Sequence, residues 1–149
     1  MKFLFLLLST WATSQVPEHV QDFINEYTPI AKEIEKEFGV PVAVTLGISS
    51  YESGFGRSYN CKNRNNFFGM KDFSVKTADK NWSWKVYKNK KESFRDFGRL
   101  LMTTKRYQVL RTLDKKDYKQ WAKLIAGCGY NNSENYPGRI IYLIERWKY

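Results

Sequence analysis

The sequence has 149 residues and a formal net charge of +10; 42% of its residues are hydrophobic and 17% are aromatic. The aromatic content excludes a disordered chain, and the length excludes a multidomain protein, because one domain typically takes about 100–200 residues. One compact, basic domain remains.

The first 14 residues have the pattern of a secretory signal peptide. Lys2 gives a positive start, the apolar run 3–8 follows, and small residues offer a cleavage site near Ala12 or Ser14. The alternative is a buried first helix. We expect the mature domain to occupy residues 15–149 and to be secreted or periplasmic. The run of six apolar residues is too short to span a bilayer, so we expect no membrane span after cleavage.

Two helices are predicted in the first half of the domain. Between residues 17 and 38, apolar residues recur three or four positions apart, which indicates one helical face. Pro29 is expected to kink or split this helix, and Gly39 to end it. Residues 41–53 are apolar on both sides, so they should form a buried, central helix that stops at Gly54.

A small hairpin and three further helices are predicted in the second half. Residues 55–71 are rich in Asn and Gly and should form an ordered loop. Two short stretches then alternate β-forming with polar residues, at 73–77 and 82–87, around a turn at 78–81. Helical faces follow at 92–104, 115–126 and 135–147. These patterns predict the α+β class: a mostly α-helical domain with a small β-hairpin lobe.

Positive charge is concentrated in residues 57–91, here called the basic segment. It holds ten Lys or Arg against two Asp, whereas residues 1–56 hold three Lys against seven acids. Such a segment favours a polyanionic partner; solubility alone is the alternative. Outside a cell, polyanionic partners include wall polymers, lipopolysaccharide and nucleic acid. Of these we expect anionic wall polymers and no nucleic acid, because a nucleic-acid binder would rest on charge alone.

Cys61 and Cys128 are the two cysteines. No C-x-x-C pair or histidine cluster accompanies them, so we expect no zinc site, no other metal and no cofactor. In an exported chain we expect the two cysteines to form a disulfide, with two independent thiols as the alternative.

Glu52 is the candidate catalytic residue. It follows an apolar helix at its C-terminal end, where the helix dipole disfavours a carboxylate. Burial beside Tyr51 and Phe55 would disfavour the charge further, and both effects raise the pKa of the carboxyl. A carboxyl that stays protonated near neutral pH is what a general acid needs in glycoside cleavage. The alternative is an ordinary exposed glutamate at a helix end.

Two motifs follow each other closely: E-S-G-F-G-R-S at residues 52–58 and N-N-F-F-G-M-K at residues 65–71. At this spacing they resemble the glucosaminidase family of peptidoglycan hydrolases, with its flagellar-rod-type and autolysin-type domains. The resemblance continues through Tyr87, Ser93-Phe94 and Asp96 to Tyr136, and covers roughly residues 30–147. It implies a lysozyme-like fold, cleavage of peptidoglycan glycan strands after N-acetylglucosamine, and no cofactor. We expect a monomer.

The resemblance also implies roles for individual residues. Glu52 corresponds to the catalytic acid, and Tyr136 lines the cleft beside it. The substrate-binding residues it implies are Asn66, Phe67, Phe68, Gly69, Phe55 and Tyr130. Amide side chains can hydrogen-bond N-acetyl groups, and aromatic faces can stack on sugar rings. The alternatives are structural: core packing for Phe67 or Phe68, loop capping for Asn65 and Asn66, and packing alone for Tyr136.

The hairpin departs from the family pattern in its carboxylates. Some members carry a second glutamate there, whereas this chain offers only Asp72 and Asp79 between Glu52 and Glu92. Without a base, the 2-acetamido group of the substrate could act as the internal nucleophile. A muramidase or a lytic transglycosylase is the enzyme alternative on the same fold, and a non-catalytic wall-binding protein is the alternative without turnover.

Overall fold

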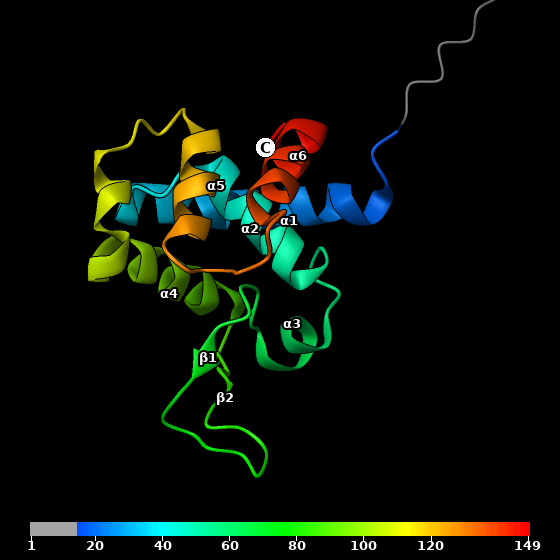
Figure 1. Cartoon of the computed structure of the whole chain (residues 1–149). Coiled ribbons are helices and arrows are strands. Elements are labelled where there is room, and N and C mark those ends of the chain that lie inside the picture. Colours follow the sequence, from blue (N-terminus) through cyan, green and yellow to red (C-terminus); the bar gives the residue numbers. More distant parts are fainter. Residues whose placement is uncertain (1–14) are drawn as a thin grey trace, which may run out of the picture.

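The computed structural model describes residues 15–149, so the predicted signal peptide lies outside the described residues. The elements are α1 (Glu18–Phe38), α2 (Val42–Ser53), α3 (Tyr59–Arg64), β1 (Lys71–Asp72), β2 (Ser83–Trp84), α4 (Lys90–Thr103), the 3₁₀ helix η1 (Lys105–Thr112), α5 (Tyr118–Gly127) and α6 (Tyr136–Trp147). The helices form one body from which the β1–β2 hairpin projects (Figure 1). The predicted fold class is confirmed.

Helix α1 runs unbroken through Pro29, so the prediction that proline splits it is wrong. Pro29 lies on the exposed side, while Tyr27 and Ala31 on either side of it are buried in the core. The carbonyl that loses its donor belongs to Asn25, which is also exposed and open to water. Gly39 ends the helix as predicted: its φ is 82°, and its N–H donates to the carbonyl of Glu35.

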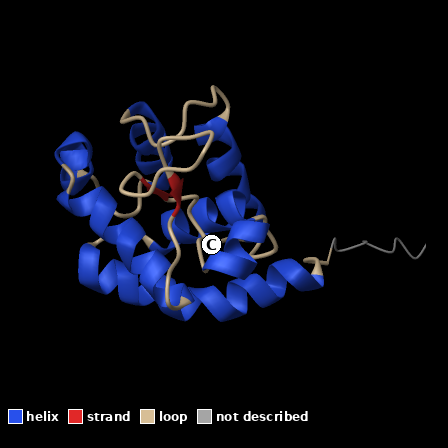
Figure 2. Cartoon of the chain, turned by 90° about the horizontal axis from the view of Figure 1, so that it is seen from below, coloured by secondary structure: helices blue, strands red, loops and turns tan. Residues whose placement is uncertain are grey.

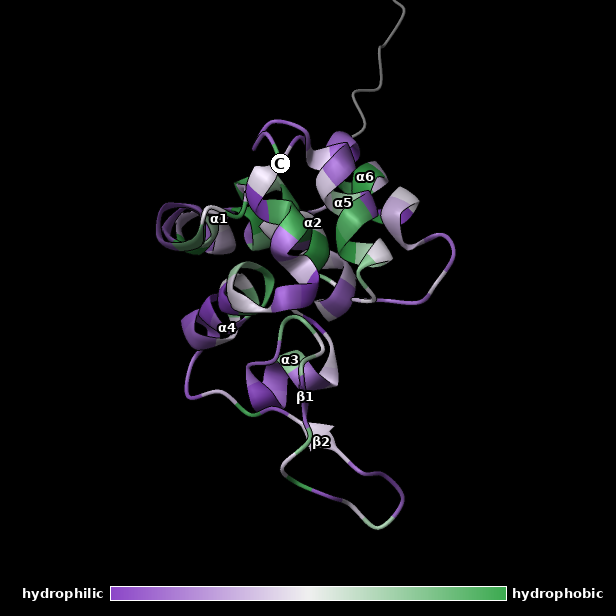
Figure 3. Cartoon of the chain, turned by 60° about the vertical axis from the view of Figure 1, so that its left-hand side comes forward, coloured by the Kyte–Doolittle hydropathy of each residue, from purple (hydrophilic) through white to green (hydrophobic). Residues whose placement is uncertain are grey.

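Helix α2 is the central helix, as predicted. It packs against α1, α5 and α6, and hydrophobic residues gather where α2, α5 and α6 meet (Figure 3). Helix α6 approaches so closely that a Cβ on Gly47 would lie 2.9 Å from Ile144. The helix ends at Gly54, whose φ of 56° favours glycine. Glu52 therefore stands in the last turn of a buried helix.

An aromatic core joins α1, α4 and residues 67–68. Phe68 stacks on Phe97 with ring centroids 4.1 Å apart, and Tyr27 stacks on Phe94 at 5.5 Å. Phe67 contacts both Tyr27 and Phe94. This core holds the start of the hairpin against the helical body.

The expected loop over residues 55–71 contains a short helix, α3, that the prediction missed. Ser58 caps its start by accepting from the N–H of Cys61, and Asn65 ends it at a φ of 50°. Asn65, one of the asparagines that suggested a loop, is thus the residue that ends this helix.

The hairpin is present, but its strands are shorter than predicted and differently placed. Residues 71–72 pair antiparallel with residues 83–84, in the register Lys71 opposite Trp84. The Asp72 carboxylate accepts from the N–H and hydroxyl of Ser74, a local turn that ends β1. Residues 73–81 are exposed and form the loop that projects from the helical body (Figure 1). Seen from below, the two short strands are the red segments among the helices (Figure 2).

The three C-terminal helices are confirmed with small shifts at their ends, as α4, α5 and α6, while η1 between α4 and α5 was not predicted. No helix within residues 15–149 is both long and apolar enough to cross a membrane.

The predicted disulfide is wrong, because Cys61 and Cys128 are both free. Cys61 lies in α3, where burial raises the pKa of its thiol to about 12 and Lys90 and Glu26 are nearby. Cys128 follows α5 and lies near Tyr107. The two thiols thus belong to different parts of the core.

Candidate active site

The Glu52 carboxyl is half-buried at the end of α2. Burial raises its pKa above the ordinary value of 4.5, and this effect outweighs the opposing influence of Tyr136 and Asn131. The prediction that burial raises this pKa is confirmed. A carboxyl in this state retains its proton to higher pH than an exposed glutamate does, which suits a general acid.

Tyr136 places its hydroxyl beside the Glu52 carboxyl. It is the first residue of α6, and its ring is buried against Tyr51, with centroids 5.4 Å apart. The hydroxyl is close enough to lower the pKa of Glu52, although the pair does not meet the geometry of a full hydrogen bond. Burial raises the pKa of Tyr136 itself. The phenol therefore keeps its proton and can act as a donor.

Asn131 is a residue of this site that the sequence analysis missed. Its amide Nδ2 donates to Oε1 of Glu52 at 3.4 Å, across 79 positions of sequence. A donor to a carboxylate favours the ionised form and therefore lowers the pKa. The available signal was its position next to Tyr130, in the polar loop that leads to Tyr136.

Gly69 lies between the acid and the hairpin. A Cβ built on Gly69 would lie 3.6 Å from Oε2 of Glu52 and 3.8 Å from Cζ3 of Trp84. The φ of 61° at Gly69 would also strain any larger residue. Gly69 therefore lies beside both Glu52 and Trp84, and its positive φ is what favours glycine here.

Trp82 and Trp84 lie two positions apart at the second strand of the hairpin and pack against each other. Their rings pack edge to face with centroids 4.8 Å apart, and both side chains are partly exposed. The Lys71 ammonium lies 4.4 Å from the Trp82 ring centroid. A groove of about 350 Å³ runs beside these rings, lined by Arg64, Thr77, Asp79, Lys80, Trp82, Ser83, Trp84 and Val86. An aromatic, basic surface thus continues from the acid along the hairpin.

Three predicted substrate-binding residues serve the fold instead. Phe67 and Phe68 are 0% and 2% exposed, so their side chains cannot stack on a sugar. Asn66 is buried, and its amide binds the backbone N–H and carbonyl of Met70 and the carbonyl of Lys85. These predictions are corrected, because the motif that carries them is tied into the core and holds Gly69 in place.

The remaining two predicted residues lie in different surroundings. Tyr130 donates from its hydroxyl to the carbonyl of Phe68 at 2.9 Å, and joins the loop before α6 to the loop beside Glu52. Phe55 has a φ of 57° and packs edge to face on Phe23 and His19 of α1. The structure thus brings Tyr130 to the site and directs Phe55 toward α1.

The later motif residues anchor the hairpin. The Tyr87 hydroxyl and the Lys85 ammonium both donate to Oδ2 of Asp96 on α4, at 2.7 and 2.8 Å. Ser93 accepts from the N–H of Phe67 at 3.1 Å. These bonds fix the base of the hairpin, and with it the position of Trp84.

The two hairpin aspartates are engaged locally. The Ser74 hydroxyl and N–H lower the pKa of Asp72, and Asp79 accepts from the Thr77 hydroxyl at 2.9 Å. Burial, Tyr136 and Asn131 are the influences on the pKa of Glu52, and neither aspartate is among them. Within the described part of the chain, no group of three or more His, Cys, Asp or Glu side chains could hold a metal ion.

The sequence matches the Glucosaminidase family model, described as mannosyl-glycoprotein endo-beta-N-acetylglucosaminidase, over residues 28–149. The structure is similar to the catalytic domain of the autolysin Auto from Listeria monocytogenes, with a TM-score of 0.66 and 21% identity over 99% of this chain and 97% of that one. It is also similar to the glycoside hydrolase domain of FlgJ from Salmonella typhimurium, with a TM-score of 0.67 and 24% identity over 87% and 88% of the two chains. A third similar structure is a peptidoglycan hydrolase from Sphingomonas sp. A1. Its TM-score is 0.69, and its identity is 21% over 83% of this chain and 86% of that one. No curated protein matches the sequence.

Proposed function

We propose, because this chain belongs to the glucosaminidase family, that it is a peptidoglycan hydrolase which cleaves the β-1,4 glycan bond after N-acetylglucosamine. The observation that carries the proposal is the raised pKa of the Glu52 carboxyl, which lies beside Tyr136, Asn131 and Gly69. Similarity to solved hydrolase domains named for autolysis and peptidoglycan supports this substrate class.

In the proposed reaction, Glu52 donates its proton to the glycosidic oxygen as the bond to the anomeric carbon breaks. The oxygen of the substrate's 2-acetamido group forms a bond to that carbon, held in position by the Tyr136 hydroxyl. Water then attacks the anomeric carbon and opens the ring just formed, and the Glu52 carboxylate takes a proton from this water. Glu52 therefore acts as the acid when the glycosidic bond breaks and as the base when water attacks, so the mechanism requires no second carboxylate.

This mechanism predicts that Asp72→Asn and Asp79→Asn each retain most of the hydrolytic activity. Both carboxylates are held by neighbouring hydroxyl or N–H groups of the hairpin and do not influence the pKa of Glu52. Initial rates of glycan release from purified sacculi provide the measurement. If one of these variants is as inactive as Glu52→Gln, that aspartate is the missing base and the substrate-assisted mechanism is wrong.

The bond specificity is tested by mass spectrometry of the fragments released from purified sacculi. We expect N-acetylglucosamine at the new reducing ends. N-acetylmuramic acid at these ends would identify a muramidase, and an anhydro-muramic end a lytic transglycosylase. A protein that binds sacculi and releases no fragments would instead be the non-catalytic wall-binding alternative.

The proposal also places the protein outside the cytoplasm, where peptidoglycan lies, as a secreted or periplasmic monomer. The basic segment would hold it on anionic wall polymers through exposed lysines such as Lys71 and Lys80, which flank the Trp82 ring. Attraction of this kind weakens as salt is added.

A further inference from the structure

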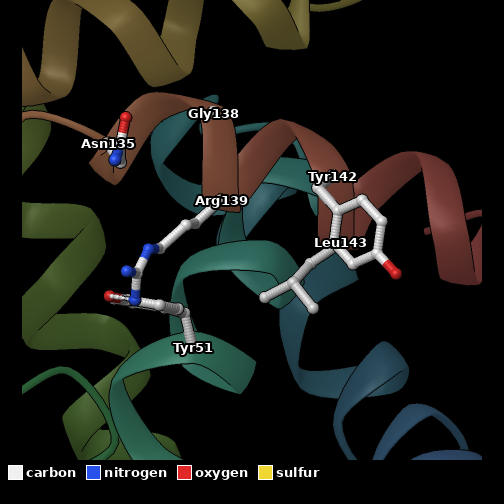
Figure 4. A pocket seen from close by; sticks show the side chains of 6 residues that line it. All are labelled: Tyr51, Asn135, Gly138, Arg139, Tyr142 and Leu143. Carbon is white, nitrogen blue, oxygen red and sulfur yellow. Dashed lines mark hydrogen bonds between the residues drawn. The ribbon is translucent and has the colours of Figure 1, made fainter.

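A second cavity adjoins the candidate active site on the α6 side. It has a volume of about 520 Å³ and is lined by Tyr51, Asn135, Gly138, Arg139, Tyr142 and Leu143 (Figure 4). We call it the α6 pocket. Neither the mechanism above nor the family motifs use these residues.

The α6 pocket shares a wall with the site of Glu52. Tyr51 immediately precedes Glu52 in α2, and Asn135 immediately precedes Tyr136. The rings of Tyr51 and Tyr136 pack edge to face between the two sites. A group attached to the glycan close to the bond at Glu52 therefore lies within reach of the α6 pocket.

Arg139 supplies a positive charge and hydrogen-bond donors to the α6 pocket. The guanidinium lies across Tyr51 (Figure 4), and its Nη1 donates to the Tyr51 hydroxyl at 3.1 Å. It forms no ion pair with a carboxylate of residues 15–149. The other lining residues are uncharged at neutral pH. The remaining guanidinium donors match the paired oxygens of a carboxylate.

The far side of the α6 pocket is apolar. Leu143 and Tyr142 lie beyond the Arg139–Tyr51 pair (Figure 4), and the Tyr142 side chain is 61% exposed. A ligand suited to this pocket therefore carries a carboxylate at one point and aliphatic groups beside it. Short peptides of small and acidic residues have this composition.

We propose that the α6 pocket binds the peptide stem attached to the muramic acid next to the scissile bond, with Arg139 pairing with a stem carboxylate. This inference rests on the proposed function, because the glycan at Glu52 brings the stem to the pocket. It makes the substrate the stem-bearing glycan rather than a bare amino-sugar polymer.

The test compares two substrates: glycan strands that keep their stems, and the same strands from which an amidase has removed them. We expect the wild-type protein to show a higher kcat/KM on stem-bearing strands, and Arg139→Gln to reduce this preference by about tenfold, as expected for loss of a charge-assisted hydrogen bond. Arg111 on η1 is also exposed, so Arg111→Gln likewise removes one positive surface charge and should keep the wild-type ratio.

An unchanged preference for stem-bearing strands in Arg139→Gln would overturn the assignment of the stem to this pocket. Hydrolysis of both substrates in that case would still support the proposed function. If the wild-type protein cuts neither substrate, the proposed function fails. Calorimetric titration with the free tetrapeptide stem then tests peptide binding at the α6 pocket without any hydrolysis. Binding to the wild type that is lost in Arg139→Gln supports the assignment. Equal binding to both proteins, or binding to neither, refutes it.

Discussion

Replacing Glu52 by glutamine is expected to lower the rate of glycan hydrolysis by about 10²–10⁴-fold while the protein stays folded. Glutamine keeps the size and the hydrogen-bonding reach of the side chain but has no acidic proton for the leaving oxygen. The half-buried position at the end of α2 accepts a neutral amide, because burial already disfavours the charged carboxylate. The measurement is release of reducing ends from sacculi, with circular dichroism to confirm the fold.

Glu134→Gln is the matched control, since this glutamate is exposed in the loop before α6. It should hydrolyse sacculi at the wild-type rate. If Glu52→Gln is folded and equally active, Glu52 is not the acid.

The stability of Glu52→Gln has a predictable dependence on pH. Below the ordinary pKa of 4.5, the carboxyl is protonated in both folded and unfolded states, so wild type and variant should unfold alike. As pH rises toward the raised pKa of the folded state, the unfolded chain ionises first and the wild type loses stability. The glutamine variant should therefore unfold at a higher temperature than wild type at neutral pH, and thermal melts at both pH values measure this difference.

Replacing Tyr136 by phenylalanine is expected to lower kcat by about 10²-fold, the typical cost of removing one preorganised donor. Phenylalanine preserves the buried ring that packs on Tyr51 and Tyr130 and removes only the hydroxyl beside Glu52. A residue that acted by packing alone would tolerate this change. Steady-state rates on soluble glycan fragments provide the measurement.

The same variant should also change the pH profile. The wild-type rate is expected to fall as pH rises through the raised pKa of Glu52, because the proton donor is lost. The Tyr136 hydroxyl lowers this pKa, so its removal raises the pKa and should move the fall in rate to higher pH. Tyr59→Phe, at a side chain that is 69% exposed on α3, is the control. An unchanged rate and pH profile in Tyr136→Phe would assign Tyr136 to packing.

Local patterns predicted most of the helical body and the position of the acid. The central helix was recognisable because it carries apolar residues on both sides, and Gly39 and Gly54 mark helix ends because each adopts a positive φ. These features depend on residues a few positions apart, so the chain itself contains the information. The short helix α3 was missed because its capping residues, Ser58 and Asn65, are also common in loops.

Helical periodicity and capping depend on neighbours along the chain, so the fold class, the central helix and the place of Glu52 at its end follow from the sequence. The side chains that surround the carboxyl depend instead on tertiary packing. Phe67 and Phe68 are adjacent to Gly69, yet the α4 aromatics draw both into the core and leave Gly69 beside Glu52. Asn131 reaches Glu52 from a distant loop. Burial and contacts between distant segments depend on how the helices pack, which no short stretch of sequence specifies.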